Sequence, residues 1–339
     1  MVKIKLYMCG GEYPISEFPL GLGYLKTNCK ADIEIVKNKK DLKECDFIGL
    51  STNAWGIKEA VDILNATEIP VVIGGQGTLW KGLEDYNFSH IVIGEGENAL
   101  NRIIDGADEK IIRMSNIKDI DSLKFPDRGR CGEHVPIFTS RGCPFRCSFC
   151  SSQNFWKNIR FHSAEYFIEE VEYILKRYPQ VKVLRIFDDL FIANRKRFEK
   201  IFELWLKKNF QKRLKLKGFV RSNIVDLIAV KMMKKIGFLS IRFGAESGSD
   251  RILKLLNKGN TVEDNQRAID IANHVGLPIQ GSFMYDIPGE RKEDLELTKD
   301  FIKRNQGKMS VSGWYKFRSF PGTLFYAGED LMKTDMKVR

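Results

Sequence analysis

The stretch RGCPFRCSFC, residues 141–150, carries Cys143, Cys147 and Cys150 in the spacing C-x3-C-x2-C. Spacers this short form a tight loop, so the three thiolates can converge on one face of a small cluster. Thiolate is a soft ligand that selects iron–sulfur clusters, zinc or copper(I). A cubane cluster normally takes four protein thiolates, so three of them leave one iron open to another molecule.

The residues around the cysteines add two features. Phe149 lies between the last two cysteines, where its ring could meet a flat ligand. The segment PIFTS, 136–140, is predicted to be a buried strand, which places the cysteines just past a strand's C-terminal end. On spacing alone, the alternative is a structural zinc knuckle that uses Cys131 or His134 as its fourth ligand.

With its aromatic residue before the last cysteine, the loop resembles the C-x3-C-x-aromatic-C signature of the radical S-adenosylmethionine (SAM) enzymes. In that family the open iron chelates the amino and carboxylate groups of SAM, and the reduced cluster cleaves SAM to a 5′-deoxyadenosyl radical. The resemblance implies a four-iron four-sulfur cluster on Cys143, Cys147 and Cys150, with SAM as a second cofactor. It also implies an external electron donor such as flavodoxin or ferredoxin.

The composition predicts a cytoplasmic protein of two domains. The chain has 339 residues, and no apolar run approaches the roughly 20 residues that span a bilayer, so no membrane partner is expected. The N-terminus MVKIKLYMCGGEY lacks the profile of a signal peptide. Seven cysteines, with three of them clustered, do not suggest a disulfide framework and fit a reducing compartment.

The charge is uneven along the chain. Residues 1–110 carry 12 Lys and Arg against 17 Asp and Glu, whereas residues 111–339 carry 43 against 27. A basic C-terminal part suits an anionic partner such as a nucleotide, a nucleic acid or a phosphorylated metabolite. A lysine-rich solvated surface explains the same charge, and we expect that instead. The substrate is expected to be a small molecule or an anionic one, with nucleic acid possible but not favoured.

Residues 1–110 alternate short apolar runs with amphipathic stretches, which predicts a doubly wound parallel sheet of the Rossmann type. Strands are predicted at 2–8, 31–36, 46–52, 69–75 and 90–96, and helices at 19–28, 57–65 and 97–104. Such sheets bind ligands at the carboxyl ends of their strands. The residues expected there are small or polar: Gly10, Ser51, Thr52, Asn53, Gly74, Gly75, Gln76, Gly94, Glu95 and Gly96.

The segments PLGLGYLKTN (19–28), GLSTNA (49–54), VVIGGQGT (71–78) and VIGEGENAL (92–100) resemble landmarks of the cobalamin-binding domain in one class of radical SAM enzymes. The resemblance implies that the ten edge residues bind cobalamin. The D-x-H-x-x-G signature, whose histidine ligates cobalt in other cobalamin proteins, is absent, and His90 stands at a strand start. No cobalt ligand is therefore assigned, and a degenerate, empty domain is the alternative.

From residue 136 the pattern is strand then helix, repeated. Strands are predicted at 136–140, 182–187, 214–221, 239–244, 278–284 and 310–317, and helices at 164–177, 195–209, 224–236, 249–256, 262–275 and 291–305. Six units suit the open partial TIM barrel, (β/α)6, of radical SAM enzymes. We therefore expect a cobalamin-binding-like domain over 1–110, a linker over 111–135, the partial barrel over 136–326 and a C-terminal tail over 327–339.

In barrels of this kind the chemistry lies at the C-terminal ends of the strands. Asp188 could accept hydrogen bonds from an ammonium group, whereas Asp189 or Asn194 more simply caps a turn or a helix. Arg221 and Ser222 could pair with a carboxylate, because the guanidinium fork matches carboxylate geometry. The segment RFGAESGSDRILKLLNKG (242–259) resembles the family's G-x-E-S-G segment, which assigns Glu246, beside Gly244, to the SAM ribose. The same resemblance places Phe149 against SAM.

Two later segments extend the resemblance almost to the end of the chain. GSFMYDIPGERKED (281–294) is similar to the family's fifth-strand segment, but Tyr285 and Asp286 stand where an apolar residue and glycine are usual. FRSFPGTLFY (317–326) resembles a segment common in the cobalamin-dependent class.

The resemblance as a whole implies a cobalamin-dependent radical SAM enzyme, in the first place a methyltransferase acting on an unactivated carbon. In that class methylcobalamin donates the methyl group and a second SAM restores it. The alternatives are a rearrangement or ring contraction, an RNA-modifying or methylthio-transferring enzyme, and a non-catalytic regulator that binds zinc or cobalamin. The substrate itself does not follow from the sequence.

Overall fold

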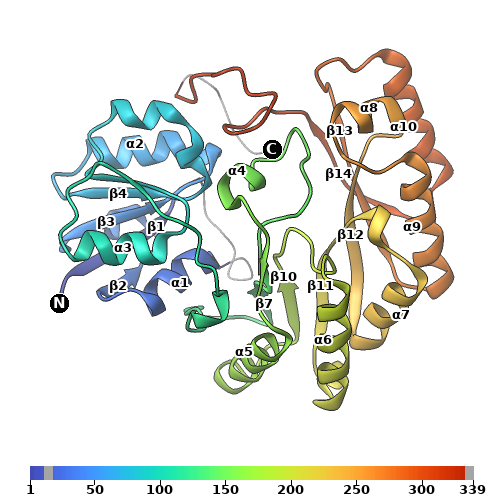
Figure 1. The fold of residues 1–339 in the computed structure, drawn as a ribbon, viewed down its shortest axis with the longest axis horizontal. Coiled ribbons are helices and arrows are strands. Elements are labelled where there is room, and N and C mark those ends of the chain that lie inside the picture. The colour runs from blue at the N-terminus through green and yellow to red at the C-terminus, as the bar shows by residue number, and fades with distance from the viewer. Residues whose placement is uncertain (11–17, 333–339) are drawn as a thin grey trace. The chain divides into compact units, whose positions relative to one another are not determined.

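The structure is a computed structural model that describes residues 1–10 and 18–332. Contacts within the chain divide it into two units (Figure 1). The N-terminal unit contains the described residues up to 130 together with 154–157 and 320–332, and the barrel unit contains 131–153 and 158–319. None of the helices in the described part of the chain combines the length and the hydropathy that a bilayer span requires.

The N-terminal unit is built on a six-stranded parallel sheet in the order β2-β1-β3-β4-β5-β6. The strands are β1 (Lys3–Met8), β2 (Asp32–Ile35), β3 (Phe47–Ser51), β4 (Val71–Gly74), β5 (His90–Ile93) and β6 (Ile111–Arg113). The helices are α1 (Leu20–Asn28), α2 (Ile57–Asn65) and α3 (Gly96–Ile104). The order runs outward from β1 in both directions, so the predicted doubly wound sheet is confirmed.

Apolar side chains of these strands alternate between the two faces of the sheet, as the two-residue period of a strand requires. On one face Ile73 of β4 packs in a cluster with Val61 of α2. On the other face its neighbour Val72 packs with Leu22 of α1 and Leu100 of α3. Helices therefore cover both faces, and the carboxyl ends of the strands are left as the edge where a ligand can bind.

The N-terminal unit extends beyond the predicted boundary at residue 110. The three residues of β6 pair with β5 and complete the sheet, so much of the predicted linker 111–135 belongs to this unit. Leu331, from the predicted tail 327–339, is buried in the same cluster as Ile73. The sequence did not indicate this because a three-residue strand is too short to display a period, and a returning segment has no local signature.

The barrel unit contains six parallel strands in the order β7-β10-β11-β12-β13-β14, the same as their order in the chain. The strands are β7 (His134–Ile137), β10 (Val183–Ile186), β11 (Lys215–Val220), β12 (Phe238–Glu246), β13 (Ile279–Tyr285) and β14 (Ser310–Lys316). The helices are α5 (Ala164–Arg177), α6 (Arg195–Lys207), α7 (Leu227–Ile236), α8 (Asp250–Leu255), α9 (Val262–Val275) and α10 (Lys292–Arg304). This is the open six-unit barrel that the repeat predicted.

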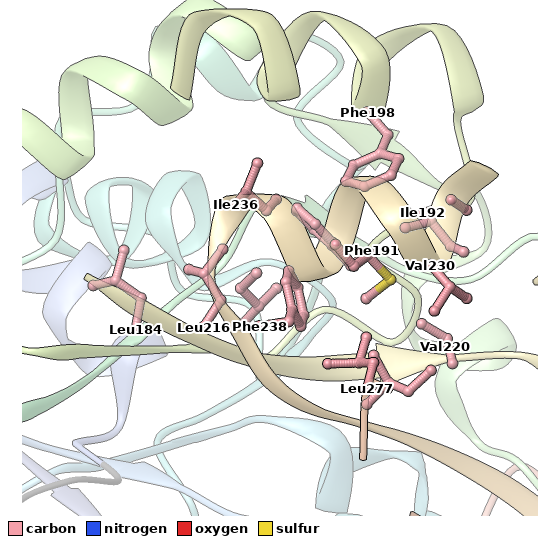
Figure 2. Close-up of a cluster of buried hydrophobic side chains, with 14 of the residues drawn as sticks. Leu184, Phe191, Ile192, Phe198, Leu216, Val220, Val230, Ile236, Phe238 and Leu277 are labelled. Atoms are coloured by element: carbon pink, nitrogen blue, oxygen red, sulfur yellow. The ribbon is translucent and has the colours of Figure 1, made fainter. Parts of the chain in front are cut away.

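The core of this unit lies between the sheet and its helices (Figure 2). Phe191 and Phe238 pack with ring centroids 5.8 Å apart, and Phe198 of α6 meets Phe191 edge to face at 5.5 Å. Leu216 of β11 and Ile236 of α7 are both fully buried. Each such side chain contributes about 1.5–3 kcal/mol on burial, so the sheet is a rigid support for the loops at its ends.

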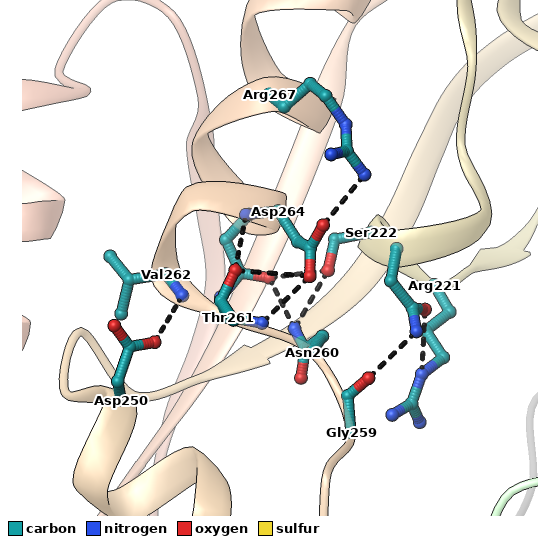
Figure 3. Close-up of polar contacts among 11 residues, drawn as sticks. Arg221, Ser222, Asp250, Gly259, Asn260, Thr261, Val262, Asp264 and Arg267 are labelled. Atoms are coloured by element: carbon teal, nitrogen blue, oxygen red, sulfur yellow. Dashed lines mark hydrogen bonds and ion pairs between the residues drawn. The ribbon is translucent and has the colours of Figure 1, made fainter.

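Caps fix where the barrel helices begin. The Asn194 side chain accepts a hydrogen bond from the backbone N of Arg197 at 3.0 Å, so its predicted role as a helix cap is confirmed. At the start of α9, Thr261 and Asp264 form a reciprocal capping box (Figure 3). These caps set the start of each helix just after a strand-end turn, where the candidate residues lie.

Two short elements that the sequence did not reveal frame the cysteine loop. Strand β8 (Ser140–Arg141) pairs antiparallel with β9 (Arg160–Phe161), so residues 142–159 project as one loop from a closed base. The loop contains the short helix α4 (Ser152–Trp156). A two-residue pair of strands carries no period that could have predicted it.

Candidate functional site

The cysteine loop leaves the C-terminal end of the first barrel strand, as predicted. Gly142 adopts φ +88° immediately before Cys143, a conformation that favours glycine. Within the loop, the backbone N of Cys150 donates to the carbonyl of Cys147 at 3.1 Å. The loop is also tied to the end of α8, because the backbone N of Ser148 donates to the carbonyl of Leu256 at 2.9 Å. The three half-buried cysteines are thus held together on an anchored turn.

Burial makes the thiols of Cys143 and Cys150 hard to ionise, because it raises the pKa of each. It raises the pKa of Cys150 to about 11, with a further contribution from the carboxylate of Asp189 and from the neighbouring cysteines. Burial also raises the pKa of Cys143, which the backbone N–H of Phe145 and the charge of Arg221 partly offset. Thiolate must form for a metal to bind, so cluster binding here releases protons. The donor set of three soft sulfurs fits an iron–sulfur cluster.

The zinc-knuckle alternative does not fit this geometry. His134 begins β7 and Cys131 precedes it, whereas the cysteine loop follows the other end of that strand. At about 3.3 Å per residue, the length of β7 alone keeps them roughly 10 Å or more from the loop. Cys131 packs against the barrel core instead. Among the described residues, no three His, Cys, Asp or Glu side chains are arranged to hold a single metal ion, and this includes the three loop cysteines.

The two aspartates after β10 have different surroundings. Asp188 is buried, and it accepts hydrogen bonds from the backbone N and the hydroxyl of Thr139 and from the backbone N of Ser140. Burial raises the pKa of Asp188, although the charge of Arg197 acts in the opposite direction. Its oxygens therefore tie two strand ends together, and the structure does not direct them toward the ammonium group predicted from the sequence.

Asp189, predicted to be a turn residue, is the aspartate that lies beside the cysteines. It accepts a hydrogen bond from the Ser152 hydroxyl at 2.5 Å, and its charge acts on both Cys143 and Cys150. Burial raises the pKa of Asp189 as well. Both aspartates lie beyond the end of β10, and their different hydrogen-bond partners leave only Asp189 beside the loop.

Arg221 and Ser222 follow β11 and have separate partners (Figure 3). Arg221 is 7% exposed, and its Nη1 lies 3.4 Å from Sγ of Cys147. The Ser222 hydroxyl donates to Oδ1 of Asn265 at 2.6 Å and accepts from Nδ2 of Asn260 at 2.9 Å. Ser222 is therefore part of a buried polar network, whereas Arg221 faces the cysteines. Its Nη2 is buried without a hydrogen-bond partner, which leaves a donor for an anionic ligand.

Glu246 ends β12 at an irregularity of the sheet and has φ +61°, which is uncommon for a residue other than glycine. Its Oε1 accepts a hydrogen bond from Nζ of Lys258 at 2.6 Å, and both side chains are about 10% exposed or less. A Cβ at Gly244 would lie 2.0 Å from this oxygen, so the glycine makes room for the Glu246 side chain. The pair places a carboxylate at the end of the strand, as predicted.

Phe149 is half-buried, and Nζ of Lys258 lies 5.5 Å from the centroid of its ring. Lys258 thus links the cysteine loop with Glu246, a role that the sequence did not reveal. It stands within the segment that resembles the family motif, twelve residues after Glu246 in the printed sequence. A single lysine in a chain with 55 basic residues carries no signal of its own. The sequence did not reveal Asn260 and Asn265 either, because a single asparagine also carries no signal of its own.

At the carboxyl edge of the N-terminal sheet, two predicted glycines serve the turn itself. Gly75 has φ +91°, and a Cβ there would lie 2.5 Å from the carbonyl oxygen of Thr52. Gly10 has φ +109°, and its backbone N donates to Glu59 at 2.9 Å. Gly74 differs, because a Cβ there would meet Val92 only at an ordinary 3.8 Å. A ligand can therefore approach the backbone at Gly74, whereas the backbone at Gly75 is packed tightly against Thr52.

The remaining predicted edge residues fall into three groups. Thr52 is buried, and Asn53 accepts from the backbone N of Trp55 and so caps the next turn. Glu95 is buried and accepts from the backbone N of Ile117 at 2.6 Å. The other four are exposed or half-buried at the edge: Ser51, Gln76, Gly94 and Gly96. His90 contacts the carbonyl of Glu109 at the strand's opposite end, consistent with its exclusion as a cobalt ligand.

Residues 137–302 match the Radical SAM superfamily. PH0819, an uncharacterized methyltransferase of Pyrococcus horikoshii, is 32% identical over 278 residues, which cover 78% of the chain and 54% of that protein. An anaerobic magnesium-protoporphyrin IX monomethyl ester cyclase of Rubrivivax gelatinosus is 29% identical over 187 residues, or 55% of the chain and 33% of that protein. The chain thus spans between a third and about half of the length of these relatives.

A solved structure shares the fold of both units. It is the radical S-adenosylmethionine methyltransferase TsrM from Kitasatospora setae, with cobalamin and a [4Fe-4S] cluster bound. The TM-score is 0.76 at 15% identity, and the likeness covers 96% of this chain and 74% of that one. At this identity the likeness is one of fold, and it confirms a Rossmann-type sheet followed by a partial barrel.

The superfamily match and the site geometry concern the same part of the chain. The matched residues run from the end of β7 into α10, and they include the cysteine loop, Arg221, Glu246 and Lys258. The loop has the superfamily's cysteine spacing and lies at the carboxyl end of the first barrel strand, where barrel enzymes place their chemistry. Residues 137–302 of the chain therefore form a radical SAM domain.

Proposed function

We propose that this protein is a cobalamin-dependent radical SAM enzyme, and that it transfers a methyl group to an unactivated carbon of a small or anionic substrate. The observation that carries the proposal is the set of residues at the carboxyl ends of the barrel strands. Three soft thiolates, a buried guanidinium and a buried carboxylate lie there, in a chain that also carries a Rossmann-type sheet.

The cluster and SAM would be held by residues already described. Cys143, Cys147 and Cys150 supply the thiolates for a four-iron four-sulfur cluster. Arg221 supplies a buried Nη2 donor that suits the carboxylate of SAM, and Glu246 suits its ribose hydroxyls. When bound, the reduced cluster and SAM supply a 5′-deoxyadenosyl radical that takes hydrogen from carbon.

The side chains around these groups position the ligand and exclude water. Lys258 holds Glu246 in a fixed orientation through a buried ion pair and lies over the ring of Phe149. Phe149 offers an apolar surface between two cysteines, which suits the flat adenine of SAM. Because these contacts are partly buried, they are stronger than they would be in water, and the ligand meets a preorganised site.

Cobalamin suits the N-terminal unit for two reasons. The carboxyl edge of a doubly wound sheet is the usual ligand site, and the exposed or half-buried Ser51, Gly74, Gln76 and Gly94 give a large flat ligand access to the backbone. TsrM, which has the same fold, was solved with cobalamin bound. None of the edge residues assigned from the sequence is a histidine, so none of them is proposed as a cobalt ligand.

Methyl transfer is supported by two similar proteins that are named as methyltransferases, PH0819 and TsrM. The cyclase among the relatives favours a second candidate, a radical reaction of another type on the same cofactors. Both candidates require the cluster and SAM, and they differ in whether a methyl group of SAM is consumed.

Anaerobic reconstitution with iron, sulfide and hydroxocobalamin tests the proposal. We expect the protein to hold a four-iron cluster, retain cobalamin, and convert SAM to both 5′-deoxyadenosine and S-adenosylhomocysteine. Cys147→Ala should lose the cluster and the 5′-deoxyadenosine. Cys131→Ala, a matched cysteine outside the loop, should keep both, since Cys131 packs against the barrel core.

Three outcomes would contradict the proposal. A protein that binds zinc and no iron would be the non-catalytic regulator. A wild-type protein that binds no cobalamin would remove the cobalamin assignment. Formation of 5′-deoxyadenosine without S-adenosylhomocysteine would favour the second candidate.

A further inference from the structure

Arg221 makes a contact that binding of SAM does not require. It follows directly after β11, at the carboxyl end of that strand, and its guanidinium is turned toward the cysteine loop. Nη1 donates to Sγ of Cys147 at 3.4 Å, the middle cysteine of the motif. The guanidinium carbon also lies 3.8 Å from the ring centroid of Phe145, two residues before Cys147.

Neighbouring groups fix this orientation. Nε of Arg221 donates to Oδ1 of Asn223 at 3.0 Å, and Nδ2 of Asn223 donates to the carbonyl of Gly259 at 3.0 Å (Figure 3). Gly259 has φ +67°, and a Cβ there would come within 3.4 Å of Nη2 of Arg221. The carbonyl of Phe145 accepts from Nε2 of Gln153 at 2.6 Å, which steadies the ring below the guanidinium. The cation is therefore held beside the sulfur by contacts on several sides.

A positive hydrogen-bond donor on a ligating sulfur changes how readily a cluster takes up an electron. The extra electron of the reduced cluster is shared with its sulfur atoms, so a charged N–H donor stabilises the reduced form more than the oxidised form. Hydrogen bonds to the sulfurs and solvent exposure are known means by which proteins set cluster potentials. Arg221 is 7% exposed, so solvent screens its charge only weakly.

We propose that Arg221 raises the reduction potential of the cluster on Cys143, Cys147 and Cys150 by donating a hydrogen bond to Sγ of Cys147. The step concerned is the transfer of one electron from a low-potential donor protein to the oxidised cluster. The proposal rests on the cluster of the proposed function and gives Arg221 a second role, because Nη2 stays available to a ligand while Nη1 serves the sulfur.

Other charges near the loop act differently. Lys258 is neutralised by its ion pair with Glu246, and its nearest loop group is the ring of Phe149. Asp189 places negative charge near Cys143 and Cys150, which opposes reduction. Arg221 thus offsets the negative charge that Asp189 places near the same loop.

The test is the midpoint potential of the reconstituted cluster without SAM, followed by electron paramagnetic resonance at controlled potentials. We expect Arg221→Gln to lower the midpoint potential by about 59 mV for this one-electron couple. At a fixed strength of reductant, the ratio of reduced to oxidised cluster then falls about tenfold. Arg221→Lys should give a smaller decrease, because the charge remains while the planar donor is lost. Asn223→Ala should also give a smaller decrease, since it releases Nε.

The matched control is Arg242→Gln. Arg242 lies on the neighbouring strand β12, and its Nε donates to Gln280 at 2.6 Å. Removing that charge should leave the potential close to the wild-type value. An unchanged potential in Arg221→Gln, or an equal shift in Arg242→Gln, would overturn the proposal. Loss of iron from both Arg221 variants would overturn it in favour of a purely structural role. Failure of the wild-type protein to form any cluster would instead refute the proposed function.

Discussion

The ion pair between Glu246 and Lys258 allows its effects on folding and on SAM binding to be separated. Glu246→Gln keeps the size of the side chain and the same left-handed backbone, so the cost of φ +61° cancels between the two proteins. It leaves Lys258, which is 7% exposed, buried without its partner. Breaking a buried pair in this way costs about 3–5 kcal/mol of folding free energy. The proposed charged hydrogen bond between Glu246 and the SAM ribose would be lost too, which would cost about 1.5–3 kcal/mol of binding.

The double variant Glu246→Gln with Lys258→Met removes both charges and keeps similar volumes. Its stability in urea should return most of the way to the wild-type value, because neither charge is then left unpaired. Its affinity for SAM, measured by equilibrium dialysis on the reconstituted protein, should stay about ten- to a hundred-fold weaker. If the double variant binds SAM as tightly as the wild type, Glu246 has a structural role only. If Glu246→Gln alone unfolds at the wild-type urea concentration, the ion pair does not form as described.

Three further outcomes are expected. Gly244→Ala should weaken SAM binding more than cluster binding, because the added Cβ would displace the Glu246 side chain. The comparison is between SAM affinity and iron content. Equal losses of both would show a general folding defect. Hydrogen bonding to Arg251 and Ser249 holds the pKa of Asp294 well below its usual range. The ionised Asp294 carboxylate therefore stabilises the fold above about pH 4, and this stabilisation decreases as the pH falls further. In urea, Asp294→Asn should cost about 1.5–3 kcal/mol at pH 7, and a gap that did not shrink below pH 4 would contradict this account. Gly74→Leu should reduce cobalamin retention while the protein stays folded. Gly75→Leu should instead unfold the N-terminal unit, as measured by circular dichroism, because Gly75 packs against Thr52. If both variants were folded, this distinction would be refuted.

The long elements of the fold could be predicted from the sequence because each displays several periods of its pattern. The helix predicted at 164–177 is α5 (Ala164–Arg177), and the strand predicted at 278–284 is β13 (Ile279–Tyr285). Strands β6 and β8 could not be predicted, because two or three residues contain no full alternation. The return of residues 320–332 to the N-terminal unit depends on contacts between distant parts of the chain, which no local pattern encodes.

The candidate site was predictable where a motif carries it and less so elsewhere. The cysteines and Glu246 stand in segments with characteristic spacing, and the structure places both at strand ends. Asp188 and Asp189 are adjacent, and only the packing around them determines which one faces the cysteines. Lys258 matters because it pairs with Glu246. The turn after α8 brings the two side chains together, and the presence of a lysine in the sequence does not predict that turn.

The burial of Leu331 in the N-terminal unit has a consequence for biosynthesis. Strand β6 is complete when the ribosome has passed Arg113, but Leu331, a buried member of the apolar cluster that contains Ile73, is then still missing from it. At about 5–20 residues per second, Leu331 follows roughly 10–40 s later, after the whole barrel has been made. Throughout that interval the nascent N-terminal unit exposes an apolar patch, which makes it a target for chaperones and proteases until the last part of its core arrives.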